Sequence, residues 1–207
     1  MLRAEADSHS SGPIAWLPTL LAKGARPLQP QHLRRRPRAA QPVRLHLIVL
    51  DVSGSMRQRG RLALAKGHAM LLIQEAARSG DDVGLLCFGG QGVDLLLPPG
   101  RARSAGSARV ARVGGGGGTP LTQALAQAEG LLRRAARGNG AGESWLWLLT
   151  DGRTLEQPAQ PTVPQHVVIV DFDERSRPIG RCASWAARWG AEHRFASQPC
   201  AACPTTP

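Results

Sequence analysis

The sequence contains no tyrosine, and aromatic residues make up only 4% of its 207 residues. Lysine is nearly absent too, because Lys23 and Lys66 are the only two, so arginine carries almost all of the positive charge. No apolar run approaches the ~18 residues of a membrane-spanning helix, which excludes such a helix. The first ten residues also lack the apolar stretch of a secretion signal, so we expect a cytoplasmic protein.

Cysteine is scarce as well, which limits the metal and redox chemistry to consider. Cys87 lies in an apolar segment and is predicted to be a buried thiol. Cys200 and Cys203 have the spacing of a metal or redox pair, but they stand in a proline-rich tail. No second pair completes a four-thiolate zinc site, so we expect neither zinc binding nor redox chemistry.

The sequence also lacks the signatures of an independent enzyme. Its six histidines are scattered, and no serine has a recognisable histidine partner for a hydrolase triad. A Gly-x-x-x-x-Gly-Lys-Ser/Thr phosphate loop is missing. We therefore expect no catalytic residues and no enzymatic activity from this chain alone.

What is abundant is positive charge, with 26 basic and 15 acidic residues and a net charge of +11. Residues 1–44 hold eight basic and two acidic residues, so +6 of that charge lies there. Residues 1–42 are predicted to be a basic, largely irregular arm that suits an acidic partner, unless it merely reflects an arginine-rich composition. A nucleic acid is disfavoured as the partner, because interleaved aromatic residues and a reader motif are both missing. The arginines that we expect to bind a partner are Arg34, Arg35, Arg36 and Arg38.

From Val43 onward the hydrophobic pattern predicts an α/β domain, residues 43–196, followed by a flexible tail, residues 197–207. Strands are predicted at 45–50, 83–88, 93–97, 144–150 and 166–171, and helices at 61–79, after Thr119-Pro120, and at 181–189. We also expect a short helix within 101–113 and a last strand that begins at Phe195. The alternation of strands and helices predicts a mostly parallel sheet with helices on both faces, and the glycine turn at 89–92 makes one edge strand antiparallel.

Oxygen-bearing side chains follow two of the predicted strands. Asp51-x-Ser53-x-Ser55 comes directly after the first strand, and Asp151 follows a later one, while Thr119 comes after a glycine run. Sites in parallel sheets form at the carboxyl ends of the strands, so we expect these residues to gather. Hydroxyls and carboxylates suit Mg²⁺ or Mn²⁺, and so few ligands leave room for one from outside. The alternatives are a turn stabilised by Asp51 and a helix cap at Thr119.

These residues carry a family resemblance. The chain resembles a von Willebrand factor A (vWA) domain with a metal-ion-dependent adhesion site, over roughly residues 43–196. It is more similar still to the carboxy-terminal part of the D subunit of magnesium chelatase and cobaltochelatase. The supporting segments are 49–56, 65–67, 82–83 with Phe88, 96–99, 116–121 and 148–153.

The resemblance implies a Rossmann-like fold and a bound Mg²⁺. Ser53, Ser55 and Thr119 would be its hydroxyl ligands. Asp51 and Asp151 would bind it directly or through water, and a partner's carboxylate would complete the shell.

The resemblance also implies a complex. The D subunit acts with an AAA+ ATPase and a large tetrapyrrole-binding subunit, and ATP drives insertion of magnesium or cobalt into the tetrapyrrole. Because the phosphate loop is missing and the arm is basic rather than acidic, we expect a stand-alone, non-catalytic module that docks on the ATPase. The alternative is an adaptor for a MoxR-like AAA+ ATPase in metalloenzyme maturation, with the same site and a different partner.

Overall fold

The computed structural model describes residues 14–35, 43–90, 92–103, 108, 110, 119–138, 142–173 and 179–196. The chain divides into two compact units, Met1–Gln41 and Pro42–Pro207. Several predictions lie outside the described residues, namely the tail at 197–207, most of the helix within 101–113, and two arginines of the basic arm, Arg36 and Arg38.

The first unit contains a short helix, α1 (Trp16–Lys23), and a single 3-10 turn, η1 (Pro30–His32). The chain returns along α1, because Ala15 N donates to the Arg34 carbonyl at 2.7 Å and Arg34 N donates to Thr19 Oγ1 at 2.9 Å. The prediction of a largely irregular arm omitted this helix. Pro18 is compatible with this helix because it lies in the first turn, where its missing N–H has no intrahelical partner to lose.

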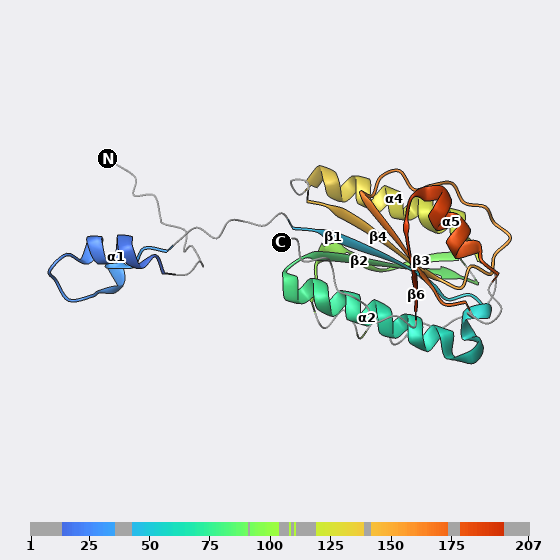
Figure 1. Ribbon diagram of the computed structural model, residues 1–207, viewed down its shortest axis with the longest axis horizontal. Helices are drawn as coiled ribbons and strands as arrows, with labels where there is room; N and C mark the ends of the chain where they lie inside the picture. Colours follow the sequence, from blue (N-terminus) through green and yellow to red (C-terminus); the bar gives the residue numbers. More distant parts are fainter. Residues whose placement is uncertain are drawn as a thin grey trace. The chain divides into compact units, whose positions relative to one another are not determined.

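The second unit is built on a six-stranded sheet with the order β3-β2-β1-β4-β5-β6 (Figure 1). Neighbouring strands are parallel except for β2 and β3, which pair antiparallel at one edge. This confirms the predicted α/β class and the single antiparallel edge strand. The strands are β1 (Leu45–Asp51), β2 (Asp82–Gly89), β3 (Gly92–Arg101), β4 (Ser144–Thr150), β5 (His166–Asp171) and β6 (Glu192–Phe195).

Helices cover both faces of this sheet, as predicted. The helix α2 (Arg61–Ser79) lies on one face, and α4 (Leu121–Gly138) and α5 (Arg181–Trp189) lie on the other (Figure 1). Successive side chains of β1 point to opposite faces, so Ile48 packs in the core under α2 while Leu47 packs in the core under α4 and α5. None of the described helices is long and apolar enough to cross a membrane.

Two strands differ from their predicted bounds by more than one residue. The strand β3 runs to Arg101, beyond the predicted end at Leu97, and passes through Pro98 and Pro99. Prolines fit there because β3 is an edge strand, where a missing N–H breaks no interior ladder. The strand β6 ends at Phe195 rather than beginning there, because Phe195 pairs with Asp171, the last residue of β5.

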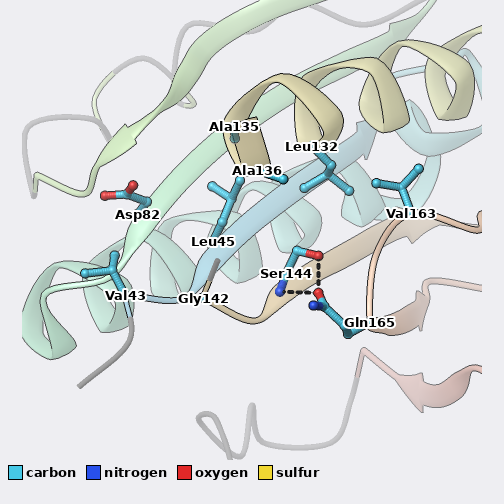
Figure 2. Close-up of a pocket in the computed structure, with 10 residues that line it drawn as sticks. All are labelled: Val43, Leu45, Asp82, Leu132, Ala135, Ala136, Gly142, Ser144, Val163 and Gln165. Atoms are coloured by element: carbon cyan, nitrogen blue, oxygen red, sulfur yellow. Dashed lines mark hydrogen bonds between the residues drawn. The ribbon is translucent and has the colours of Figure 1, made fainter. Parts of the chain in front are cut away.

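A pocket of about 130 Å³ opens at the amino ends of β1 and β4 (Figure 2). Its lining is largely apolar and includes Val43, Leu45 and Leu132. At its rim Ser144 N donates to Gln165 Oε1 at 2.7 Å. The pocket therefore lies at the opposite edge of the sheet from the predicted site, which is expected at the carboxyl ends.

Candidate metal centre

Asp51 ends β1 and is fully buried at the carboxyl edge of the sheet. Its Oδ1 accepts a hydrogen bond from Ser53 N at 2.8 Å, and its Oδ2 accepts one from Thr150 Oγ1 at 2.6 Å. Thr150 ends the neighbouring parallel strand β4, which brings its hydroxyl to the same edge. Burial raises the pKa of Asp51 to about 6, despite these hydrogen bonds.

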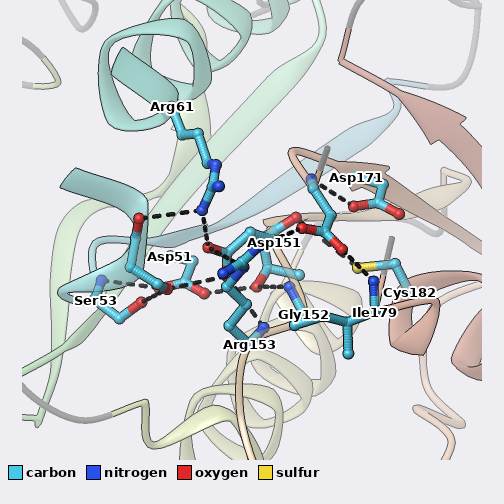
Figure 3. A network of polar contacts seen from close by, with 12 residues as sticks. Asp51, Ser53, Arg61, Asp151, Gly152, Arg153, Asp171, Ile179 and Cys182 are labelled. Carbon is cyan, nitrogen blue, oxygen red and sulfur yellow. Dashed lines mark hydrogen bonds and ion pairs between the residues drawn. The ribbon is translucent and has the colours of Figure 1, made fainter. Parts of the chain in front are cut away.

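A chain of hydroxyls links the loop after β1 to the loop after β4 (Figure 3). Ser53 Oγ lies 3.2 Å from Ser55 Oγ, and Ser55 Oγ donates to Asp151 Oδ1 at 3.1 Å. A hydroxyl has one hydrogen, so the hydrogen between the two serines comes from Ser53 when Ser55 gives its own to Asp151. Lone pairs on both serine oxygens then remain for a cation.

Thr119, the fifth predicted ligand, is half-buried and lies two residues before the start of α4. Its carbonyl accepts a hydrogen bond from Leu121 N at 2.8 Å. Among the described residues, the hydrogen bonds that join Asp51, Ser53, Ser55 and Asp151 do not extend to it. The structure thus brings four of the five predicted residues together, and a metal-ligand role for each of the five stays a prediction.

Two arginines that the sequence reasoning missed also reach Asp151 (Figure 3). Arg61 is only 6% exposed, and its Nη1 lies 3.1 Å from Asp151 Oδ2 and 3.4 Å from the Ser55 carbonyl. Arg153 N donates to Asp151 Oδ1 at 3.1 Å, and its Nη2 donates to Asp173 Oδ1 at 2.9 Å. One signal for Arg61 was present in the sequence, because the helix dipole disfavours a basic residue in the first helical turn.

The acidic residues at the end of β5 and just after it accept hydrogen bonds from the backbone of the turn that follows the strand. Asp171 Oδ1 accepts from Asp173 N at 2.8 Å, and Asp173 Oδ2 accepts from Ile179 N at 2.6 Å. Their neighbour Cys182 is buried, and burial raises the pKa of its thiol far above the ordinary value. Burial likewise raises the pKa of Cys87 to about 12, so neither thiol is poised to react.

The chemistry of the gathered groups fits a hard divalent cation. Asp51 and Asp151 supply carboxylates, and Ser53 and Ser55 supply hydroxyls, with neither nitrogen nor sulfur among them. Within the described ranges, no cluster of three or more His, Cys, Asp or Glu side chains is arranged for a metal. A cation at this edge would therefore depend on the serine hydroxyls, which suits Mg²⁺ or Mn²⁺ better than zinc.

Comparison with known proteins identifies the family to which this chain belongs. The sequence profile of the von Willebrand factor type A domain matches residues 46–153, which include β1 from its second residue, the serine loop and the turn after β4. The chain belongs to the von Willebrand factor type A family. The predicted resemblance to a vWA domain is confirmed.

Curated relatives of this vWA domain include subunits of magnesium chelatase. The 60 kDa subunit of Cereibacter sphaeroides is 43% identical over 112 residues, which cover 53% of this chain and 19% of that protein. The 67 kDa subunit of Heliobacterium mobile is 39% identical over 120 residues, 56% of this chain and 18% of that protein. The protein Rv2850c of Mycobacterium tuberculosis is 35% identical over 147 residues, 68% of this chain and 23% of that protein. The chain spans about a fifth of the length of these relatives.

Solved structures agree on the fold. The protein BatB from Bacteroides thetaiotaomicron matches with a TM-score of 0.57 and 19% identity, over 74% of this chain and 89% of that chain. The SpRpn10 VWA domain matches with a TM-score of 0.57 and 12% identity, over 74% of this chain and 87% of that chain. At such low identity the likeness establishes the vWA fold alone.

Proposed function

We propose that this chain is a non-catalytic vWA subunit of an ATP-dependent chelatase that inserts magnesium or cobalt into a tetrapyrrole. The observation that carries the proposal is the set of converging oxygens at the carboxyl edge, from Asp51, Ser53, Ser55 and Asp151. The similarity of the same domain to magnesium-chelatase subunits supports the chelatase context.

In this proposal, Ser53, Ser55 and Thr119 hold Mg²⁺ or Mn²⁺ together with Asp51 and Asp151, which bind it directly or through water. The bound cation supplies positive charge and a coordination position that a carboxylate of a partner can fill. The chain's own contribution is preorganisation. Thr150 and the backbone N–H of Ser53 hold the Asp51 carboxylate in place before any ligand arrives.

The partner that we propose for this site is the AAA+ ATPase subunit, and in the assembled chelatase a large tetrapyrrole-binding subunit joins them. The basic arm, with Arg34, Arg35, Arg36 and Arg38, provides a second contact to an acidic surface of the ATPase. An ATP-driven partner also suggests the cytoplasm as the location of the complex.

The first test measures the cation and the partner together. Isothermal titration with Mn²⁺ should show one site in the wild-type chain and no binding in Asp51→Ala. Capture of the AAA+ partner should be lost in EDTA and in the Ser53→Ala, Ser55→Ala double variant, because both treatments remove the coordination position. Asp94→Ala, at an exposed position on β3, is the control and should behave like the wild type.

Two results would contradict the proposal. Equal Mn²⁺ affinity in Asp51→Ala would remove the metal site, and partner capture that survives both EDTA and the double serine variant would remove its adhesive role. Metal-dependent capture of a MoxR-type ATPase in place of a chelatase ATPase would favour the adaptor alternative.

A further inference from the structure

We propose that Arg61 is a positioning residue that competes with the cation for Asp151, so that the site takes up its metal most tightly together with a carboxylate from the partner. This inference rests on the proposed metal site. It concerns a residue at the start of α2 that lies within the network but has no ligand atom to offer a cation.

Arg61 is placed to compete because it contacts the oxygen of Asp151 that the serines leave over. Ser55 Oγ donates to Oδ1 of Asp151, whereas Arg61 Nη1 lies 3.1 Å from Oδ2. The two side chains are both almost completely buried, Arg61 at 6% and Asp151 at 1% exposure. Little solvent is therefore available to screen the guanidinium from a cation at the serine hydroxyls.

The charges of the site show what this contact does. Asp51 and Asp151, when ionised, contribute two negative charges, and Arg61 offsets one of them. Arg153 Nε also lies 3.8 Å from Asp151 Oδ2, but its guanidinium pairs more closely with Asp173 at 2.9 Å, so the Arg153–Asp173 pair adds no net charge. A divalent cation thus meets a net charge of −1 from Asp51, Asp151 and Arg61, and once bound it leaves these groups with a net charge of +1.

That remaining positive charge links the metal to the partner. A cation that attracts the Asp151 carboxylate weakens the contact between that carboxylate and the Arg61 guanidinium, and weakening a buried ion pair costs free energy. A carboxylate from a partner restores the charge balance of the site, because one anion offsets the excess positive charge of the cation and Arg61 together. Metal binding and carboxylate binding should then strengthen each other reciprocally.

A purely structural role for Arg61 predicts the opposite result. Arg61 also contacts the Ser55 carbonyl at 3.4 Å, so it ties the start of α2 to the serine loop. If this were its whole role, removing the guanidinium would loosen the loop and weaken metal binding. The direction of the change in metal affinity therefore separates the two roles.

The experiment titrates Mn²⁺ into the full chain and into Arg61→Gln and Arg61→Met, two neutral variants of which the second keeps an apolar stem for packing. Both should bind Mn²⁺ more tightly than the wild type, by about fivefold or more, the lower range of a typical coupling between sites. Arg61→Lys keeps the charge and should stay close to the wild type. Arg78→Gln, which removes an exposed arginine from the end of α2, is the matched control.

A double variant tests whether Arg61 acts through Asp151. Relative to Asp151→Asn alone, adding Arg61→Gln should change the affinity less than it does in the wild-type background. Equal or weaker Mn²⁺ binding by folded neutral variants, or the same gain with and without Asp151, would overturn the inference.

The wild-type chain provides a second measurement that needs no variant to fold. Mn²⁺ and acetate together should raise its melting temperature by more than the sum of their separate effects, with chloride replacing acetate at equal ionic strength as the control. Strictly additive shifts would overturn the coupling. If the wild-type chain binds no Mn²⁺ at all, the proposed function fails as well, whereas failure of the Arg61 tests alone leaves the metal site intact.

Discussion

At the scale of single residues, Asp51 has the most demanding environment of the candidate ligands. Its carboxylate is fully buried, and burial outweighs the hydrogen bonds from Ser53 and Thr150, so its pKa rises to about 6. The folded state then binds the Asp51 proton more tightly than the unfolded chain does. The stability that this proton confers is fully present below the ordinary pKa near 4 and is lost as the pH rises through about 6.

We therefore predict that Asp51→Asn stabilises the metal-free domain in a pH-dependent way. In EDTA, the free energy of unfolding of the variant relative to the wild type should rise from its value at pH 4 by about 2–3 kcal/mol at pH 7, since one pKa unit corresponds to about 1.4 kcal/mol. Urea unfolding at several pH values measures this difference. Asp94→Asn on β3 is the control, and a difference for Asp51→Asn that does not change with pH would contradict the prediction.

At the scale of secondary structure elements, the site depends on a close approach between the turn after β4 and the helix α5. Gly152 has a φ of +65°, and a Cβ built on it would lie 2.9 Å from the sulfur of Cys182 on α5. Both the left-handed backbone and the lack of space favour glycine next to Asp151. The turn that presents Asp151 is therefore shaped by α5 as well as by the sheet.

Gly152→Ala should destabilise the domain by about 1–3 kcal/mol, because strain at a positive φ adds to a steric conflict with α5. It should also weaken Mn²⁺ binding, since the conflict displaces the residue next to Asp151. Gly67→Ala is the matched control, because its Cβ meets open space on α2 and alanine is favoured in a helix by up to about 1 kcal/mol. Urea unfolding compares the two variants, and equal stability would argue against the close approach.

At the scale of the whole molecule, the positive charge is concentrated in the first unit. Its described part carries Lys23, Arg26, Arg34 and Arg35 and no acidic residue, next to an α1 helix whose Trp16 is 58% exposed. Charge of one sign over an extended segment steers an oppositely charged partner, and this contribution falls as salt screens it.

Deleting residues 1–40 should therefore weaken the proposed ATPase complex and flatten its salt dependence, while the vWA domain keeps its melting temperature. A quadruple variant with glutamine at positions 34, 35, 36 and 38 separates the contribution of charge from that of the exposed apolar side chains of α1, Trp16 among them. It should flatten the salt dependence as much as the deletion does. The affinity for the ATPase, measured between 50 and 500 mM salt, provides the comparison. If the salt dependence is unchanged in both variants, the arm does not contribute to binding.

The sequence by itself determined the positions of most strands and helices, because the burial of one or both faces of an element leaves a local pattern of apolar residues. The apolar run at 45–50 predicted the central strand, and the spacing of Asp51, Ser53 and Ser55 directly after it predicted the site at the carboxyl edge. The bounds of most strands and helices followed from the same patterns, since each element buries one face or both. In the arm, the apolar stretch was too short to indicate a helix, so α1 was not predicted.

What only the tertiary structure decided depends on which strands become neighbours. The strand order places β1 between β2 and β4, and this order sets Thr150 against Asp51 and Asp151 against Ser55. The contact between Arg61 and Asp151 joins residues 90 positions apart, so no local periodicity can encode it. Local patterns record which face of an element is buried, whereas the partners within the site follow from the packing of elements that are distant in the chain.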